Sequence, residues 1–191
     1  MKDVLAEMRL VMSYVAIVFR PGHKPAAHPA HIPAQLELPQ GWGQADYERF
    51  IDEVRRAIDT QQNDKRDVRS RAQVTLTTAL LLGGAVAAGG ATHRNSLWQL
   101  AAFVLAFILV GVGALASAGV MTARSDIGAV NLRNLAAANS GELDKEAAAG
   151  YAAVAFIGSE TVAVMVTVLR TSVLFLLLSF LVFALLYVVP S

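Results

Sequence analysis

Residues 166–189 read VTVLRTSVLFLLLSFLVFALLYVV and contain a single charged side chain. A helix needs roughly 20 apolar residues, at a rise of about 1.5 Å each, to cross the hydrocarbon core of a bilayer. Two further apolar stretches, residues 74–91 and 98–121, come before this one. We therefore expect an all-α membrane protein with three transmembrane helices, in which residues 74–121 form a hairpin and residues 166–190 form the C-terminal span.

The composition of the whole chain also favours a membrane protein. Hydrophobic residues make up 55% of its 191 residues, which is high for a soluble domain. The formal net charge is only +1, so no overall field attracts nucleic acid, and we expect the lipid bilayer to be the main partner. The absence of cysteine excludes disulfides, thiolate metal sites and thiol nucleophiles.

Residues 1–43 are expected to form a leader and a proline-rich linker. The apolar run at residues 10–19 is too short to cross a membrane. It suits either a signal peptide, which Asp3 and Glu7 in the would-be positive region disfavour, or a leader that is poorly ordered or lies on a surface. Residues 21–43 hold five of the six prolines, so we expect them to be extended or disordered.

Candidate catalytic and metal-binding groups are few. Three histidines lie in the proline-rich linker, namely His23, His28 and His31. A metal site is one interpretation, but their uneven spacing, with no carboxylate or cysteine nearby, favours ordinary surface histidines. The glycine pairs of the first apolar stretch lack the following lysine of a phosphate-binding loop. We therefore expect no enzyme activity, no catalytic residues and no bound metal or cofactor.

Residues 44–73 are predicted to form a cytoplasmic amphipathic helix. Apolar side chains recur along them at helical spacing, at Tyr47, Phe50, Ile51, Val54 and Ile58. Such a stripe is typical of a helix that packs one face against a partner. After Asp59 the stripe gives way to polar residues, so a break or a bend is expected there.

The transmembrane hairpin is rich in small residues. Glycine, alanine and serine let helix backbones approach closely, and this contact holds helices together in lipid. The candidate contact residues are Gly83, Gly84, Ala87, Ala88, Gly111, Gly113, Ala114, Ser117 and Ala118. An alanine-rich chain also carries small residues for compositional reasons, so the sequence leaves open which faces touch.

Arginine and lysine mark the cytoplasmic ends of the spans. The expected membrane-surface anchors are Lys65, Arg66, Arg69, Arg71, Arg124 and Arg170. By the positive-inside rule, their distribution places the N-terminal half and residues 122–165 in the cytoplasm and the C-terminus outside. The cluster before the first span is interpreted as ordinary anchoring, with a sensor of anionic lipid as the alternative.

Residues 122–165 are expected to form a cytoplasmic helical segment. No strong helix breaker occurs between Ala147 and Pro190, so one helix would reach about 60 Å, twice the hydrocarbon thickness. Its first half, residues 151–169, should therefore leave the membrane and pack on the apolar stripe of the 44–73 helix. The result is a cytoplasmic helical bundle joined to the membrane helices.

Glu160 is the one acidic residue in the otherwise apolar stretch 151–169. A carboxylate in or near lipid is energetically unfavourable and is by default a functional candidate. One interpretation is a gating or ion-path role. The other is an ion pair within the cytoplasmic bundle, with Arg55, Arg56 or Arg133 as the partner.

Two strings of sequence carry a resemblance to a known family. They are DKRDVRSRAQVTLTTALLLGG at residues 64–84 and GSETVAVMVTVLRTSVLFLLLSF at residues 158–180. Together with the order of elements, from a charged cytoplasmic helix through a two-span hairpin to a final span, they resemble the Pycsar effector transmembrane family and, more loosely, the SLATT-like bacterial membrane proteins. The resemblance covers residues 47–189.

The resemblance implies a function in bacterial antiphage defence. Such an effector sits in the inner (plasma) membrane, forms homo-oligomers and impairs membrane integrity, as a pore-former does, once a cyclic nucleotide signals infection. A structural or scaffold membrane protein that binds a cytoplasmic partner is an alternative. A phage holin or exclusion protein is another.

Overall fold

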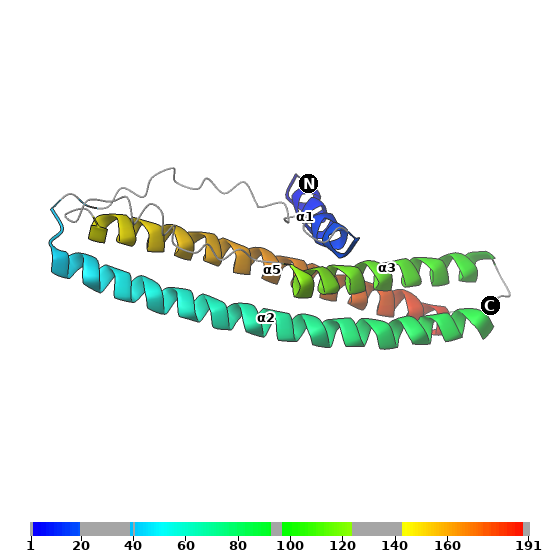
Figure 1. The fold of residues 1–191 in the computed structure, drawn as a ribbon. Helices are drawn as coiled ribbons and strands as arrows, with labels where there is room; N and C mark the ends of the chain where they lie inside the picture. Colours follow the sequence, from blue (N-terminus) through cyan, green and yellow to red (C-terminus); the bar gives the residue numbers. More distant parts are fainter. Residues whose placement is uncertain (1, 20–38, 40, 93–96, 124–142, 189–191) are drawn as a thin grey trace. The chain divides into compact units, whose positions relative to one another are not determined.

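The fold is that of a computed structural model, which describes residues 2–19, 39, 41–92, 97–123 and 143–188. Within these ranges the chain forms helices and no strand. The helices are α1 (Lys2–Phe19), α2 (Gln44–Thr92), α3 (Leu97–Thr122) and α5 (Leu143–Val188) (Figure 1). The expected all-α fold is confirmed.

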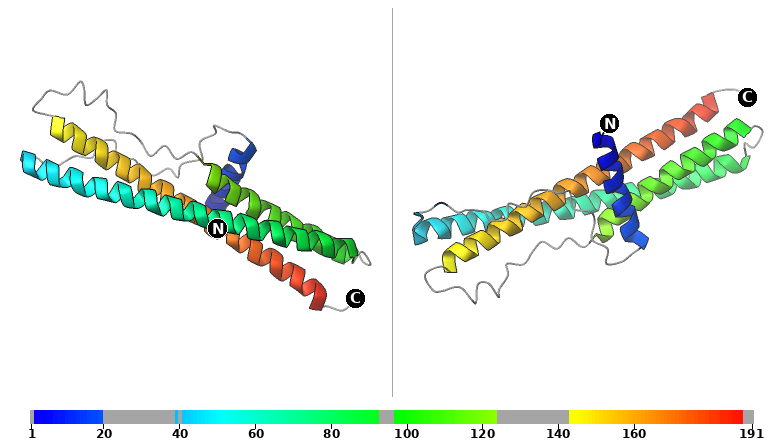
Figure 2. Two further views of the ribbon diagram at one scale, coloured as in Figure 1. Left: turned by 60° about the horizontal axis from the view of Figure 1, so that its bottom comes forward. Right: turned by 90° about the horizontal axis from the view of Figure 1, so that it is seen from above.

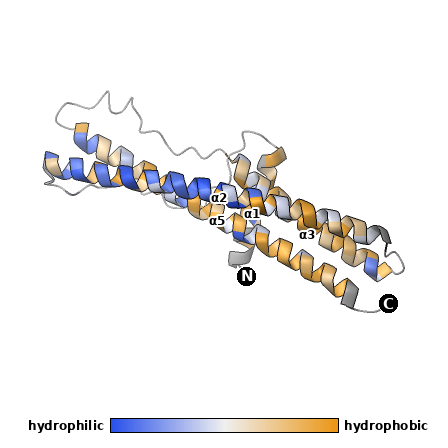
Figure 3. Ribbon diagram, turned by 90° about the horizontal axis from the view of Figure 1, so that it is seen from below, coloured by the Kyte–Doolittle hydropathy of each residue, from blue (hydrophilic) through white to orange (hydrophobic). Residues whose placement is uncertain are grey.

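Three of these helices are long and apolar enough to cross a membrane. They are Gln44–Gly90 within α2, the whole of α3, and Leu143–Leu186 within α5. Figure 3 shows polar residues concentrated in the N-terminal part of α2, whereas α3 and the C-terminal part of α5 are hydrophobic. The protein thus has three candidate membrane spans, as the sequence predicts.

The chain divides into two compact units, and α2 and α5 contribute to both. Unit 1 comprises Met1–Ala26, Val68–Ala123 and Met165–Ser191, and unit 2 comprises Ala27–Asp67 and Arg124–Val164. Residues 20–38 and 124–142 lie outside the described part of the chain. The extended or disordered state expected for the linker therefore stays a prediction where it falls on residues 20–38. The helical structure expected for residues 124–142 also stays a prediction.

The core of unit 1 draws on α2, α3 and α5. Its apolar side chains form two clusters, Ala79 with Val110 and Leu176, and Val86 with Phe103 and Ala106. A Cβ at Gly83 would meet Val110, and a Cβ at Gly90, further along α2, would meet Phe103, which lies earlier on α3. Helices α2 and α3 therefore run antiparallel and form the predicted hairpin.

Helix α1 is also part of unit 1, where it packs on α3 and crosses it rather than running alongside it (Figure 2). Its buried side chains are Leu10, Val11 and Tyr14. Residues 2–19, for which the sequence left open a signal peptide, a leader on a surface and a poorly ordered leader, form a helix in the structure. A short apolar helix is stable here because its buried side chains pack within unit 1 rather than face water.

Helix α2 is continuous from Gln44 to Thr92, so the break expected after Asp59 does not occur. The spacing of the apolar stripe continues through Gln61, which is half-buried, to Val68, which is buried. A polar residue can occupy such a stripe without ending the helix, and the Gln61 side-chain nitrogen has a hydrogen-bond partner on α5.

Candidate functional site

Unit 2 is built around the contact between the first part of α2 and the first part of α5. Ile51 of α2 and Ala148 of α5 are its buried centre. Around them pack the half-buried residues Trp42, Tyr47, Phe50, Ala147, Ala149 and Tyr151. The rings of Trp42 and Phe50 lie 5.2 Å apart between centroids, within the range of favourable aromatic pairs. The α2 stripe packs against α5, as predicted, but the α5 residues of this cluster, Ala147, Ala148, Ala149 and Tyr151, lie at or before the start of the expected segment 151–169.

Arg55 of α2 contacts Tyr151 of α5 in two ways. Its Nη2 donates a hydrogen bond to the tyrosine hydroxyl at 3.3 Å, and its guanidinium carbon lies 5.0 Å from the ring centroid. The hydrogen bond with Tyr151 raises the pKa of Arg55, and the carboxylate of Asp52, 3.6 Å away, acts in the same direction. Because Arg55 is more than half exposed, this contact adds little to the stability of the helix pair.

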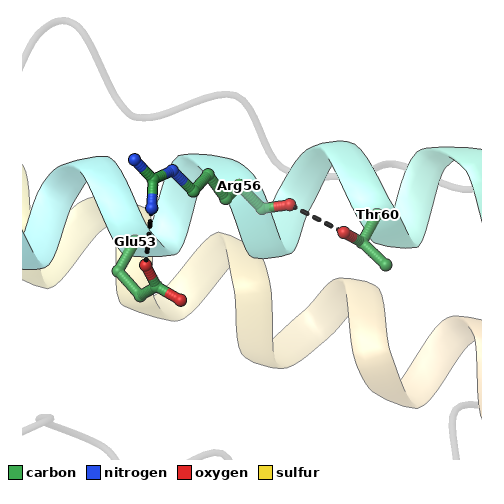
Figure 4. A network of polar contacts seen from close by, with 3 residues as sticks. All are labelled: Glu53, Arg56 and Thr60. Carbon is green, nitrogen blue, oxygen red and sulfur yellow. Dashed lines mark hydrogen bonds and ion pairs between the residues drawn. The ribbon is translucent and has the colours of Figure 1, made fainter.

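The solvent face of α2 carries its own polar contacts (Figure 4). Arg56 Nη1 lies 3.4 Å from Glu53 Oε2, and Thr60 Oγ1 donates a hydrogen bond to the Arg56 carbonyl oxygen at 3.0 Å. Both ionic side chains are more than three-quarters exposed, so the pair adds little to stability. This face is a solvated one, as the sequence predicts.

Gln61 is a half-buried polar residue between α2 and α5 that is not among the candidate site residues predicted from the sequence. Its Nε2 donates a hydrogen bond to the Ala155 carbonyl oxygen of α5 at 2.9 Å. Its Oε1 is buried and accepts no hydrogen bond within the described part of the chain. A Cβ at Gly158 would overlap this oxygen, so a larger residue there would force the Gln61 side chain to move. The sequence feature that could have indicated this contact is the position of Gln61, which follows Val54 and Ile58 at helical spacing on the apolar stripe.

Glu160 lies half-buried on α5 in unit 2. Among the residues that the structure describes, no ion pair joins it. Two of its three expected partners are engaged elsewhere, Arg55 with Asp52 and Tyr151, and Arg56 with Glu53. Arg133 lies outside the described residues. The gating or ion-pair role of Glu160 therefore stays a prediction.

The expected membrane-surface anchors fall into different settings. Lys65 and Arg66 belong to unit 2, Arg69, Arg71 and Arg170 belong to unit 1, and Arg124 lies outside the described residues. Arg66 and Arg170 are exposed, as anchors should be. Nothing in the helical arrangement tests their contact with lipid, so the anchoring role stays a prediction.

Arg69 has a specific contact within unit 1. Its Nη2 donates a 2.7 Å hydrogen bond to the carbonyl oxygen of Ala123, directly after the last residue of α3. The last carbonyls of a helix have no partner inside the helix, and a cation there also suits the helix dipole. Its Nε is buried without a partner in the described chain. Arg69 thus fixes the end of α3 to α2, a role beyond anchoring.

Only some of the small residues predicted as helix contacts lie where two helices of unit 1 approach closely. A Cβ at Gly113 would lie 3.1 Å from the Ser172 carbonyl oxygen and 3.3 Å from Leu176 of α5. By contrast, a Cβ at Gly84 or at Gly111 would meet nothing within 4 Å. Gly113 is therefore a point of close approach between α3 and α5.

Three buried serines lie on the same helix pair, and one of them joins the two helices. Ser179 Oγ of α5 donates a hydrogen bond to the Ala106 carbonyl oxygen of α3 at 2.8 Å. Ser172 Oγ instead donates to the Val168 carbonyl oxygen of its own helix at 2.9 Å. Ser117 Oγ, on α3, is buried and has no hydrogen-bond partner among the described residues. These contacts stabilise a helix bundle, and none of them aligns a nucleophile with a base.

No group of histidine, cysteine, aspartate or glutamate residues that could hold a metal ion occurs in the ranges that the structure describes. Comparison of the chain with known protein families, with curated proteins and with solved structures found no match. The functional interpretation therefore rests on the geometry of the two units and on the sequence.

Proposed function

We propose that this protein is an effector of bacterial antiphage defence that resides in the inner membrane and impairs its integrity when triggered. The N-terminus lies in the cytoplasm, the C-terminus lies outside, and several copies assemble through their spans. The support is the resemblance of residues 47–189 to the Pycsar effector transmembrane family, together with the three candidate spans.

The observation that carries the proposal is the continuity of α2 and α5. Each of them joins a segment of unit 2 to an apolar segment of unit 1 without a helix break. In this proposal, a change in the pairing of their first halves is passed on along each continuous helix to the apolar segment that follows. In this proposal, the Arg55–Tyr151 and Gln61–Ala155 contacts belong to the quiet state.

A trigger acts on this pairing by population shift. A ligand moves a two-state equilibrium only through a difference in its affinity for the two states. The resemblance implies a cyclic nucleotide as that ligand, and the helix pair of unit 2 is the part of the chain that senses it.

Inducible expression in a bacterium that carries a membrane-potential dye tests the proposal. The wild-type protein should depolarise the membrane and arrest growth when a cyclic pyrimidine nucleotide is supplied. Gly113→Leu should abolish this effect because it separates α3 from α5, and Gly111→Leu, at an open position, should retain it. Normal polarisation and growth of wild-type cells, with and without the nucleotide, would contradict the proposal.

A scaffold membrane protein is the second candidate. The observation that favours it is the exposed charged face of α2, which carries Glu48, Arg49, Asp52, Glu53 and Arg56 and is available to a cytoplasmic protein. Recovery of one stoichiometric partner from cells, with no toxicity on overexpression, would support the scaffold. Depolarisation regardless of the nucleotide would point instead to a holin.

A further inference from the structure

Helix α1 has a wider apolar surface than α3 covers. The buried side chains of α1 are Leu10, Val11 and Tyr14, all less than a tenth exposed. A second set of large apolar side chains, each more than half exposed, consists of Leu5, Met8, Met12 and Phe19. At about 100° per residue, the centre of this second set lies about 140° around the helix from the centre of the buried set.

The exposed apolar set forms one face rather than a scatter of residues. Met8, Met12 and Phe19 follow one another at helical spacings of four and seven. Half-buried Val15 and Val18 connect this face to the buried one. Exposed Arg9 borders the other side. The helix therefore has a protein-facing side, a free apolar side and a polar side.

The place of α1 on α3 is fixed by a close backbone contact. A Cβ at Gly119 would overlap the carbonyl oxygen of Tyr14, so only glycine lets the two helices approach this closely. Gly119 lies in the last turn of α3, which ends at Thr122. Helix α1 is thus attached at the C-terminal end of a candidate membrane span.

The direction of α1 matters as much as its position. It crosses α3 in the two views of Figure 2. If α3 crosses the bilayer, a helix that crosses α3 near its end lies along the membrane plane at the bilayer boundary. The apolar side chains that α3 itself exposes include Val104, Phe107 and Ile108, which are half exposed and suit contact with lipid chains.

We propose that α1 is an interfacial helix whose free apolar face, Leu5, Met8, Met12 and Phe19, inserts into the lipid at the membrane boundary next to the end of α3. Helices of this kind lie in the interface plane with the apolar face about 5–10 Å into the boundary between headgroups and acyl chains. Arg9, on the adjoining polar side, faces the headgroups and water. Lipid is the occupant that fits because the free face adjoins the end of an apolar span. This proposal needs only that α3 spans a bilayer, and it is independent of any role in defence.

Site-directed spin labelling tests the proposal, because the chain has no native cysteine to label. Single cysteines replace Met8, Met12 or, as the matched control on the polar side, Arg9. The full-length labelled protein is reconstituted in vesicles of phosphatidylethanolamine and phosphatidylglycerol. The collision rates of the nitroxide with oxygen, which concentrates in lipid, and with a water-soluble nickel chelate are then measured.

The ratio of the oxygen rate to the nickel rate should be several-fold higher for Met8→Cys and Met12→Cys than for Arg9→Cys. Equal ratios at all positions, dominated by the nickel chelate, would show that the face lies in water and would overturn the proposal. Exclusion of both reagents at positions 8 and 12, with dipolar broadening between labels, would show that a second copy of the chain covers the face, which would also overturn it.

Discussion

Gly113→Ala tests how tightly the apolar helices of unit 1 are packed. The new methyl group would lie 3.1 Å from a backbone oxygen of Ser172, which cannot move without its helix, and 3.3 Å from Leu176. Adding a methyl group to a well-packed core in this way costs about 1–3 kcal/mol. The matched control is Gly111→Ala, where nothing lies within 4 Å of the new methyl group.

The control removes the effect of helix propensity, which favours alanine over glycine by up to about 1 kcal/mol at both positions. The difference between the two variants therefore isolates the contact with α5. A difference of about 1–3 kcal/mol corresponds to a change of roughly 5- to 150-fold in the unfolding equilibrium constant.

The measurement is reversible unfolding of the purified protein in mixed micelles, by titration with a denaturing detergent and with helix content as the signal. Gly113→Ala should unfold at a lower detergent fraction than Gly111→Ala. If the two variants unfold at the same detergent fraction, α3 and α5 do not approach each other at Gly113, and the description of unit 1 is wrong.

Three further predictions concern single side chains. Arg69→Ala should lower the free energy of unfolding of the apolar helices by about 1.5–3 kcal/mol in the same titration, because it removes a charged hydrogen bond, whereas exposed Arg66→Ala should change it little. Burial raises the pKa of Tyr14 to about 12, so the stabilisation that neutral Tyr14 gives to the packing of α1 should be full below pH 10 and be lost as the pH rises through about 12. Tyr14→Phe should remove this pH dependence, as the mobility of a spin label on α1 in micelles would show. Gln61→Ala should destabilise unit 2 by about 1 kcal/mol through loss of its interhelical hydrogen bond, and exposed Gln62→Ala should not, with hydrogen exchange of the α2 amides as the measurement.

Features that depend on hydrophobic length and period could be predicted from the sequence. Three apolar stretches are long enough to cross a bilayer, and the structure has a helix at each of them. The spacing of Tyr47, Phe50 and Ile51 predicted the face of α2 that meets α5, and Ile51 is buried at that contact. In both cases one physical requirement, removal of apolar surface from water, acts on a local pattern.

Features that depend on which helix faces which could not be predicted. Gly111 and Gly113 look equivalent in the sequence, and only the position of α5 makes Gly113 a contact. Arg69 reads as one of several anchors until the end of α3 is found beside it. The contact of Tyr14 with Gly119 joins residues more than a hundred positions apart, and no local pattern indicates it.

The topology of the C-terminus tests the central claim most directly. Alkaline phosphatase, which is active only outside the cytoplasm, and green fluorescent protein, which fluoresces only inside it, are fused in turn after Ser191 and, as a control, after Thr122. With three spans and a cytoplasmic N-terminus, the Ser191 fusion should show phosphatase activity without fluorescence, and the Thr122 fusion should show the reverse. Fluorescence without phosphatase activity after Ser191 would contradict the account.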